Sequence, residues 1–455
     1  MWSQARLGKR LEFSTFVADL IQALTDRRWP SLSLPGKAKE ADLGAMCEIL
    51  LSRRGEASGV ALASIIIDTY AKADPEAQHA FLQTLLRRFD VDQGALAQAI
   101  HAYGEEQGPE SAGRLHKAAE PMRQELFRRL NMAPGGTLAL VRMREHLLQR
   151  LDEEPELAAV DADFVHLFTS WFNRGFLTLQ AIDWRTPASI LEKIIRYEAV
   201  HEITDWDELR RRVQPVDRRC FGFFHPQMPD EPLIFVEVAL AREIATSMDS
   251  LLYAERTPIP AETAATAVFY SISNCQVGLK GISFGNLLIK QVVTDLQQEL
   301  PNLRTFVTLS PVPGFADWLG GELARPSSRL IGNGDRDVLA AADLLDPAAQ
   351  DADVRAALLR GAAAYLLHAK RGDGRPLDPV SRFHLGNGAR LERINLLANR
   401  SASAMKQSFG IMVNYLYDPR AIEENHERFA ENGEVIASPE VRRLIQLGIV
   451  EIEKA

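Results

Sequence analysis

Cysteine is scarce in this chain, with three residues among 455. Cys47, Cys220 and Cys275 lie far apart, and no two of them form a Cys-x-x-Cys pair. An odd number of widely spaced cysteines argues against both a disulfide framework and a zinc site. We therefore expect free thiols that pack as small buried side chains, as in proteins of a reducing compartment.

Long apolar runs and an excess of basic residues are also missing. No stretch of 18 apolar residues occurs, so no transmembrane helix is predicted. The first residues lack the apolar segment of a secretory signal, and we predict a cytoplasmic location. Acidic residues outnumber basic ones by 61 to 52, and the net charge of −9 argues against nucleic acid and membrane surfaces as partners.

Metal-binding patterns are likewise missing from the sequence. No group of His, Cys, Asp and Glu residues has the spacing of a metal site, and His225 is interpreted as structural. We therefore predict neither a metal nor an organic cofactor.

The composition of the chain changes near residue 168, and this change predicts two domains. Residues 1–168 are expected to be helical throughout, because apolar residues recur there at about helical spacing. They show no cluster of residues suited to catalysis, so we expect a scaffold or oligomerisation domain. The expected helices are 11–25, 41–53, 60–73, 76–89, 95–103, 121–131 and 137–153.

Residues 169–455 alternate between strand-like and helical segments, which is typical of an α/β domain. The alanine-rich stretch 335–371 is interpreted as an insertion whose apolar residues pack. The predicted fold class is therefore α+β multidomain, with an all-α N-terminal domain before an α/β domain. The expected strands are 233–240, 266–272, 304–309 and 411–417, and the expected helices are 286–299, 351–371 and 420–431.

A glycine-rich loop, GLKGISFG at 278–285, follows the expected strand 266–272 and precedes the helix 286–299. Glycines let backbone N–H groups turn towards a ligand, and a helix N-terminus attracts anions. The spacing matches neither the dinucleotide-binding nor the Walker A pattern. It resembles the acyl-CoA pyrophosphate loop of the GNAT acyltransferase fold. An ordinary glycine-rich turn without a ligand is the alternative.

Two side chains are candidates for chemistry. Ser310 follows the strand 304–309 and enters a turn with two prolines, which would hold its hydroxyl in one place. His384 precedes a Gly-Asn-Gly turn, where an imidazole can be aimed into a pocket as a proton donor. The plainer alternatives are a turn serine that bonds its own backbone and an ordinary loop histidine.

Further polar side chains follow His384. Asn387 lies in the turn, and Asn414, Tyr415 and Tyr417 fall in the expected strand 411–417. An amide or a phenol near a thioester can donate a hydrogen bond to a developing oxyanion. Ordinary hydrogen bonding at the end of a sheet is the alternative.

Several segments, taken together and in order, resemble the malonyl-CoA decarboxylase family. The resemblance covers about 165–417 strongly and the helical region loosely. The matching segments are SWFNRGFL at 170–177, YEAVH at 197–201, FHP at 224–226, EPL at 231–233, AVFYSIS at 267–273, GLKGI at 278–282, LSPVPGF at 309–315, HLGNGA at 384–389 and NYLY at 414–417.

This resemblance implies a helical N-terminal domain at 1–168, a GNAT-like catalytic domain at 169–455 and a homotetramer. It places Ser310 and His384 on the catalytic serine and histidine. Some family members carry a glutamate at the position of Ser283, so the role of that position is open. The residues implied to contact the substrate are Lys280, Gly281, Ile282, Ser283, Phe284, Gly285, Asn286, Asn387 and Tyr417.

The reaction that the resemblance implies is the conversion of malonyl-CoA to acetyl-CoA and CO2, through an enolate that His384 protonates. Two other functions stay open. A GNAT-type acyltransferase would use the same loop with an amine acceptor. A non-catalytic acyl-CoA-binding regulator would bind without turnover.

Overall fold

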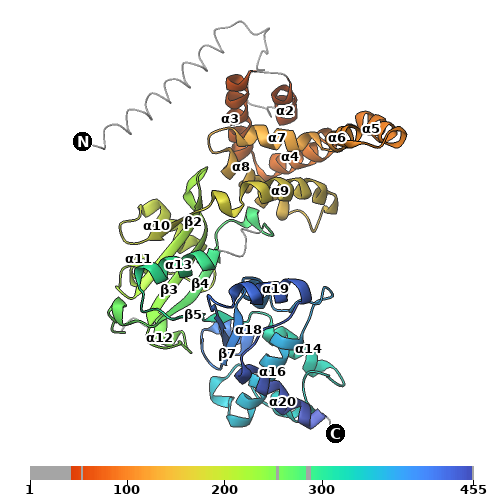
Figure 1. Ribbon diagram of the computed structural model, residues 1–455. Coiled ribbons are helices and arrows are strands. Elements are labelled where there is room, and N and C mark those ends of the chain that lie inside the picture. The colour runs from red at the N-terminus through yellow and green to blue at the C-terminus, as the bar shows by residue number, and fades with distance from the viewer. Residues whose placement is uncertain (1–41, 53–54, 253–255, 283–287, 453–455) are drawn as a thin grey trace, which may run out of the picture. The chain divides into compact units, whose positions relative to one another are not determined.

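The computed structural model describes residues 42–52, 55–252, 256–282 and 288–452 of the chain. These residues form two compact units (Figure 1). The first contains the described residues up to Trp171 together with Gln276–Ile282. The second contains Phe172–Cys275 and the described residues from Leu288 onward. The expected order, a helical region followed by a region with a mixed sheet, is confirmed.

The first unit is helical. The helices expected between 41 and 153 are confirmed with small shifts at their ends, and α6 and α9 are additional to the prediction. The expected helix 11–25 lies outside the described residues. The helices are α2 (Leu43–Leu51), α3 (Glu56–Lys72), α4 (Pro75–Arg88), α5 (Gln93–Glu105), α6 (Pro109–Ala118), α7 (Met122–Asn131), α8 (Gly136–Leu148) and α9 (Ala158–Trp171).

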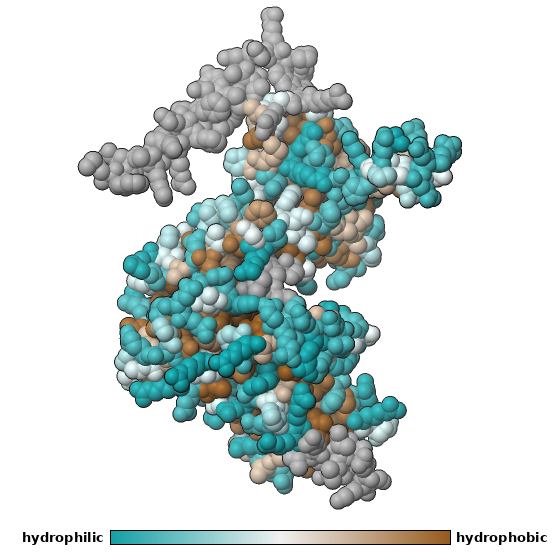
Figure 2. Space-filling view, viewed as in Figure 1, coloured by the Kyte–Doolittle hydropathy of each residue, from teal (hydrophilic) through white to brown (hydrophobic). Residues whose placement is uncertain are grey.

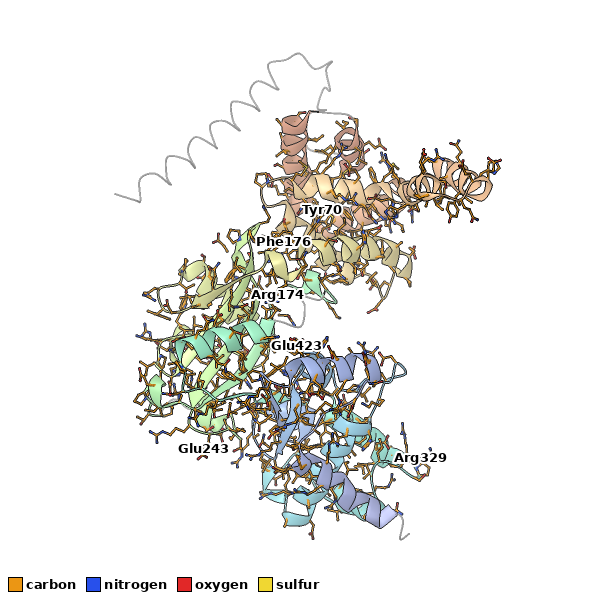
Figure 3. All side chains as sticks on the ribbon, in the orientation of Figure 1. Tyr70, Arg174, Phe176, Glu243, Arg329 and Glu423 are labelled. Atoms are coloured by element: carbon orange, nitrogen blue, oxygen red, sulfur yellow. The ribbon has the colours of Figure 1, made fainter. Side chains whose placement is uncertain are left out.

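Local sequence signals explain where these helices begin and what they bury. Asp74 caps α4 by accepting from the N–H of Ala77, and Pro75 occupies the first helical position. The Tyr70 side chain lies inside this unit (Figure 3), where its hydroxyl is 3.1 Å from Nδ1 of His146. Helix α5 buries no side chain, and the surface over α5 and α6 is mostly hydrophilic (Figure 2).

The second unit is organised around an eight-stranded sheet with the order β1-β2-β3-β4-β5-β8-β6, in which β7 also pairs with β8. The four expected strands are confirmed, whereas β1, β2, β6 and β7 are additional. The strands are β1 (Thr178–Ile182), β2 (Arg218–His225), β3 (Met228–Ala241), β4 (Thr266–Asn274), β5 (Thr305–Thr308), β6 (Ser310–Pro311), β7 (Arg390–Asn395) and β8 (Met412–Leu416).

Strands β4 and β5 form a parallel pair that separates after a few residues. Their register runs from Thr266 opposite Thr305 to Phe269 opposite Thr308. Beyond that point β4 continues along β3 as far as Asn274. The other strand breaks at 309 and resumes as β6, which pairs with β8. A gap therefore opens between the carboxyl ends of the two parallel strands.

Helices cover the sheet and complete the core. Helix α16 lies in the main hydrophobic cluster, with Leu358 and Leu366 fully buried, so the apolar side chains of the 335–371 stretch pack as expected. Expected helices 286–299, 351–371 and 420–431 correspond to α13, α16 and α19, although residues 286 and 287 are outside the described set. The helices are α10 (Ala188–Tyr197), α11 (Trp206–Val213), α12 (Asp249–Leu252), α13 (Leu288–Glu299), α14 (Phe315–Ala324), α15 (Asn333–Ala341), α16 (Ala352–His368), α17 (Pro379–Gly386), α18 (Ala402–Ser408), α19 (Ile422–Asn432) and α20 (Pro439–Ile452).

Helix α17 corrects the expectation of a loop around His384. Asp378 caps the helix by accepting from the N–H of Ser381, and Pro379 is its first residue. Gly388 follows the helix with φ of +80° and is packed so closely that a Cβ would overlap the carbonyl oxygen of Ile422. The glycine therefore permits both the turn and the close approach of α19.

None of the helices in the described part of the chain has the length and apolar character that a membrane crossing requires.

The turn after α17 generates a stability prediction. We expect Gly388→Ala to destabilise the protein most, because it combines a left-handed backbone with overlap on Ile422. Gly374→Ala, with φ of +76° and open space, should cost about 1 kcal/mol from the backbone alone. Gly372→Ala has neither penalty and serves as the control. Urea unfolding of the three variants measures the order, and equal stabilities would contradict it.

Candidate active site

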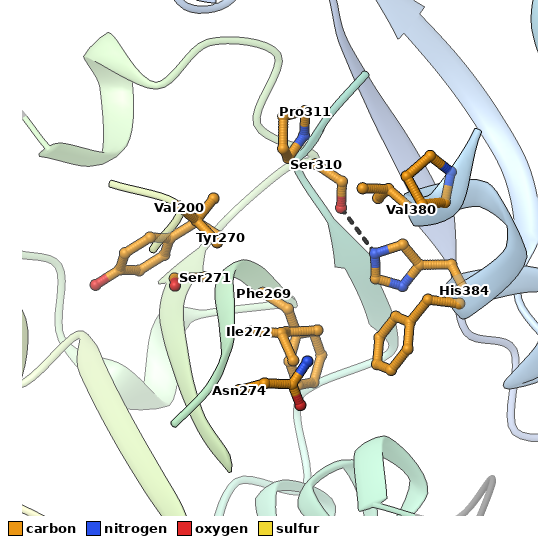
Figure 4. A pocket seen from close by; sticks show the side chains of 12 residues that line it. Val200, Phe269, Tyr270, Ser271, Ile272, Asn274, Ser310, Pro311, Val380 and His384 are labelled. Atoms are coloured by element: carbon orange, nitrogen blue, oxygen red, sulfur yellow. Dashed lines mark hydrogen bonds between the residues drawn. The ribbon is translucent and has the colours of Figure 1, made fainter. Parts of the chain in front are cut away.

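The gap between the parallel strands forms a pocket in the second unit. It has a volume of about 240 Å³, and Figure 4 shows Ser310 and His384 across it from the β4 side chains. Apart from Val200, which lies in the loop after α10, the lining residues belong to β4, β6 or α17, so the pocket is a property of the fold. Its lining residues are Val200, Phe269, Tyr270, Ser271, Ile272, Asn274, Ser310, Pro311, Pro379, Val380, Phe383 and His384.

Ser310 is held where the strand resumes after the break. It pairs with Val413 of β8, and its side chain is buried. Its hydroxyl donates to Oγ1 of Thr308 at 2.8 Å and lies 3.0 Å from Nε2 of His384. The serine is thus fixed by contacts on two sides and does not bond its own backbone as a turn serine would.

His384 lies near the C-terminal end of α17 and is buried, with 3% of its surface exposed. Its ring stacks on Tyr415 with centroids 4.6 Å apart and planes at 25°. Nε2 faces Ser310, and Nδ1 is 2.8 Å from the hydroxyl of Tyr417. Both ring nitrogens therefore have partners, and the imidazole is held in one orientation.

The protonation of this chain of residues follows from burial. Loss of solvent lowers the pKa of His384 to about 3, so the ring is neutral at pH 7. Burial raises the pKa of Tyr417 well above its ordinary value, so the phenol keeps its proton. A buried hydroxyl hydrogen needs an acceptor, and Nδ1 of His384 is within reach to accept it.

The same bonds assign the imidazole tautomer. If Tyr417 donates to Nδ1, the hydrogen of the neutral ring resides on Nε2. Ser310 already donates to Thr308, so its oxygen is free to accept from Nε2–H. The two neighbours agree, and the direction of donation runs from Tyr417 through His384 to Ser310.

This direction decides what the site can do chemically. A nucleophilic serine needs an imidazole nitrogen that accepts its proton, with a carboxylate behind the ring. Here Nε2 carries a hydrogen, and a phenol stands behind the ring. The two hydrogens beside the pocket, on Nε2 and on the Ser310 hydroxyl, are directed to Ser310 and Thr308, and each can become a donor to a bound substrate when these bonds are exchanged. Such donors suit the stabilisation of a developing anion and the return of a proton.

Further polar residues hold Ser310 and His384 in place. One of them, Thr308, was not predicted from the sequence motifs. Its Oγ1 accepts from Ser310 and also from the N–H of Tyr415 at 3.1 Å. Asn414, fully buried, donates to the Thr308 carbonyl at 2.7 Å. The amide of Asn414 thus provides ordinary sheet hydrogen bonding. The Tyr415 hydroxyl is 2.6 Å from Ser381 of α17, which ties the strand to the helix that carries His384.

The opposite wall contains a buried carboxylate beside Ser271. The Ser271 hydroxyl donates to Glu198 at 2.7 Å, and the same carboxylate accepts the N–H groups of Val200 and His201. Glu198 therefore fixes a pocket-lining hydroxyl and the loop that follows α10. The signal that could have pointed to it is the YEAVH segment, in which it is the only acidic residue.

The remaining predicted site residues that the structure describes are not among those lining this pocket. Lys280, Gly281 and Ile282 belong to the first unit, where they follow the short turn η4 (Val277–Leu279). Asn387 ends α17 and donates to the carbonyl of Phe383 at 2.7 Å, and it is not among the residues that line the pocket. The predicted loop residues Ser283, Phe284, Gly285 and Asn286 lie outside the described residues.

The cysteines are free and buried, as expected. In the part of the chain that the structure describes, no group of three or more His, Cys, Asp or Glu side chains is placed to hold a metal ion.

In the mixed α/β unit, a buried serine, histidine and tyrosine form one hydrogen-bonded chain beside a pocket. This arrangement is typical of an enzyme active site. The chain belongs to the malonyl-CoA decarboxylase family. The model of that family's C-terminal domain matches residues 175–454, and the model of its N-terminal domain matches residues 89–172.

Individual relatives agree over most of the chain. Rat mitochondrial malonyl-CoA decarboxylase is 32% identical over 418 residues, covering 83% of this chain and 84% of the rat protein. The crystal structure of malonyl-CoA decarboxylase from Rhodopseudomonas palustris is 57% identical, covers 88% of this chain and 98% of its own, and has a TM-score of 0.84. That from Agrobacterium vitis is 55% identical, with coverages of 89% and 99% and a TM-score of 0.84.

The buried imidazole predicts a pH effect on stability. His384 is neutral when folded, with a pKa of about 3, whereas an unfolded histidine binds a proton near pH 6.5. The unfolded state therefore binds more protons between these values, and stability falls as the pH is lowered through that window. From pH 7 to 5 this group should remove about 2 kcal/mol.

Urea unfolding of wild type and His384→Gln at both pH values measures the contribution. The variant should lose less stability on acidification than wild type. His101→Gln, whose side chain is 78% exposed, should behave as wild type does. Identical pH dependence in wild type and His384→Gln would refute the assignment of a neutral buried ring.

Proposed function

We propose that this protein decarboxylates malonyl-CoA to acetyl-CoA and CO2. Membership of the malonyl-CoA decarboxylase family supports the substrate and the reaction class. The observation that carries the proposal to particular residues is the hydrogen-bonded chain from Tyr417 through His384 to Ser310, which ends at the pocket.

The chemistry places three demands on the site. The bond to the carboxylate must lie perpendicular to the thioester plane, so that its electrons pass into the carbonyl as CO2 leaves. The thioester oxygen then gains negative charge and needs hydrogen-bond donors. Finally, the enolate carbon needs a proton. Ser310 is proposed to bind the malonyl carboxylate or the thioester oxygen, and His384 is proposed to deliver the proton.

The tautomer gives this step a definite form. The carbon takes the Nε2 hydrogen of His384, and the Tyr417 proton moves to Nδ1 at the same time, so the ring stays neutral. The negative charge that entered as the substrate carboxylate then passes to the Tyr417 oxygen, where burial disfavours it although a phenolate is a far weaker base than the enolate, and a proton from solvent restores the phenol. One proton is consumed for each CO2 released, as the overall reaction requires.

The CoA part of the substrate is assigned by resemblance. Lys280 to Asn286 is proposed as the loop for the pyrophosphate, and Tyr417 and Asn387 as substrate contacts. The edge of β4 beyond Phe269 no longer pairs with β5, and the amide groups of an extended ligand are proposed to lie along this edge. A cytoplasmic location, predicted from the sequence, and a homotetramer, implied by the family resemblance, complete the proposal.

One assay of the acyl-CoA pool, run without and then with an added amine, distinguishes this function from its alternatives. The purified protein is incubated with malonyl-CoA, without added metal or acceptor, and the acyl-CoA pool is followed by mass spectrometry. Acetyl-CoA formation is the expected result. Acyl transfer that appears only after an amine is added would favour the acyltransferase, and CoA binding without turnover would favour the regulator.

The site assignment predicts that Ser310→Ala and His384→Ala each lower kcat by about 100-fold or more, because each removes a donor used as charge develops. Ser403→Ala, a change on the exposed face of α18, should keep wild-type turnover. If both site variants retained near wild-type turnover, the assignment would be wrong.

The tautomer argument generates a separate prediction for two tyrosines on neighbouring positions of one strand face. Tyr417→Phe removes the donor to Nδ1 and should lower kcat by about tenfold or more, with little change in KM. Tyr415→Phe keeps the ring that stacks on His384 and loses only the bond to Ser381, so its loss should be smaller. Equal losses in the two variants would show that the Tyr417 hydroxyl does no more than position the imidazole, as the Tyr415 hydroxyl does.

A further inference from the structure

Within the first unit, Arg144 of α8 holds the segment that leads into the glycine-rich loop. Its side chain is buried, with 2% of the residue exposed. Nη1 donates to the carbonyl oxygens of Gly278 at 2.8 Å and Lys280 at 2.9 Å. Asp161 of α9 balances the charge, since its Oδ1 accepts from Nε at 2.8 Å. One guanidinium thus fixes two loop carbonyls.

A second contact fits the same segment to α8. Gly278 approaches the helix so closely that a Cβ would overlap the carbonyl oxygen of Val141. The backbone therefore rests on α8 at a position where only glycine fits, two residues before the carbonyl of Lys280 that Arg144 holds. Two independent contacts define the path of 278–280.

These contacts also decide which way the backbone N–H groups point. A peptide group is planar and trans, so its N–H points opposite to its C=O. Because the Lys280 carbonyl faces Arg144, the Gly281 N–H faces away from α8. Gly281 has φ of +82°, and both Lys280 and Gly281 are exposed. The N–H groups of Leu279, Lys280 and Ile282 are bonded to backbone carbonyls, so the Gly281 N–H beside Lys280 is the group of this segment that suits an anion.

In the sequence, the segment 276–282 follows closely on strand β4. Strand β4, which lines the pocket, ends at Asn274, and the segment Gln276–Ile282 belongs to the helical unit. The chain returns to the second unit before α13, which begins at Leu288. The start of the proposed CoA loop is therefore set by helices of the first unit.

We propose that Arg144 is a positioning residue for CoA recognition, through which the helical unit fixes residues 278–281 at the start of the loop proposed to receive the pyrophosphate. This inference rests on the proposed function for the identity of the ligand. It gives the helical unit a role in substrate binding besides that of a scaffold.

The test compares two buried arginines of the same unit. Arg144→Ala should raise KM for malonyl-CoA about tenfold or more, because charged hydrogen bonds to the loop are lost, while kcat changes little. Arg123 of α7 is the matched control. It is equally buried, and it pairs with Asp163 of α9, but none of its hydrogen bonds described here goes to the loop. Arg123→Ala should leave KM unchanged even if stability falls.

A conservative variant and a readout without turnover complete the design. Arg144→Lys should recover only part of the affinity, since one ammonium cannot reproduce the forked contact. Hydrogen exchange of the 276–282 amides should rise in Arg144→Ala and not in Arg123→Ala. That measurement needs no substrate, so it tests whether Arg144 holds the segment 276–282 even if the wild-type protein fails to decarboxylate malonyl-CoA.

Two results would overturn the inference. One is wild-type KM together with wild-type exchange of 276–282 in Arg144→Ala. The other is an equal rise of KM in the Arg123→Ala control, which would reduce the effect to general destabilisation.

Discussion

The parallel pairing of β4 and β5 lasts from Thr266 and Thr305 to Phe269 and Thr308, and the pocket exists because it stops there. Strand β3 continues to hold β4, while β8 holds β6. The antiparallel pairings of β3 with β4 and of β8 with β6 thus hold β4 and β6 apart. On the sides where these pairings lie, the backbone groups of β4 and β6 are hydrogen-bonded. Ser310 is the first paired residue after the break, so its position at the mouth of the gap follows from the sheet.

Burial and neutrality are linked in this site. An imidazolium or a phenolate in such a place would lose its hydration, which is why the pKa of His384 falls and that of Tyr417 rises. The hydrogen bonds among them join neutral groups and need no counter-ion. Under the proposed function, the substrate carboxylate would be the one charge brought into this neutral place. A localised carboxylate is less favoured there than a dispersed enolate, which assists loss of CO2.

Sequence patterns predicted the parts of this structure that depend on local chemistry. The strands that are rich in β-branched and aromatic residues and the capped helices of the first unit are found as expected. Strand β7 contains Arg390, Glu392 and Arg393, so its composition hides its place in the sheet. Helix α17 has eight residues, too few for a periodic signal, and the glycines that follow it favour a turn.

The site itself depended on tertiary structure. Ser310 and His384 are 74 positions apart, and no spacing rule brings them together. The family resemblance named both residues, but it did not reveal that Thr308 and Ser381 hold them. Nor does a pattern distinguish Tyr415, which stacks on the imidazole, from Tyr417, which bonds to it, because both point to the same side of β8. Only the packed structure separates their roles.

The assignment of Gln276–Ile282 to the helical unit has a consequence for biosynthesis. The helices up to Trp171 leave the ribosome first, and they then lack one segment of their own unit. That segment is synthesised only after β1 to β4, so Gly278 can settle on α8 only when much of the sheet has appeared. The two units are therefore interleaved in folding order, and a chain cut between them would leave each half incomplete.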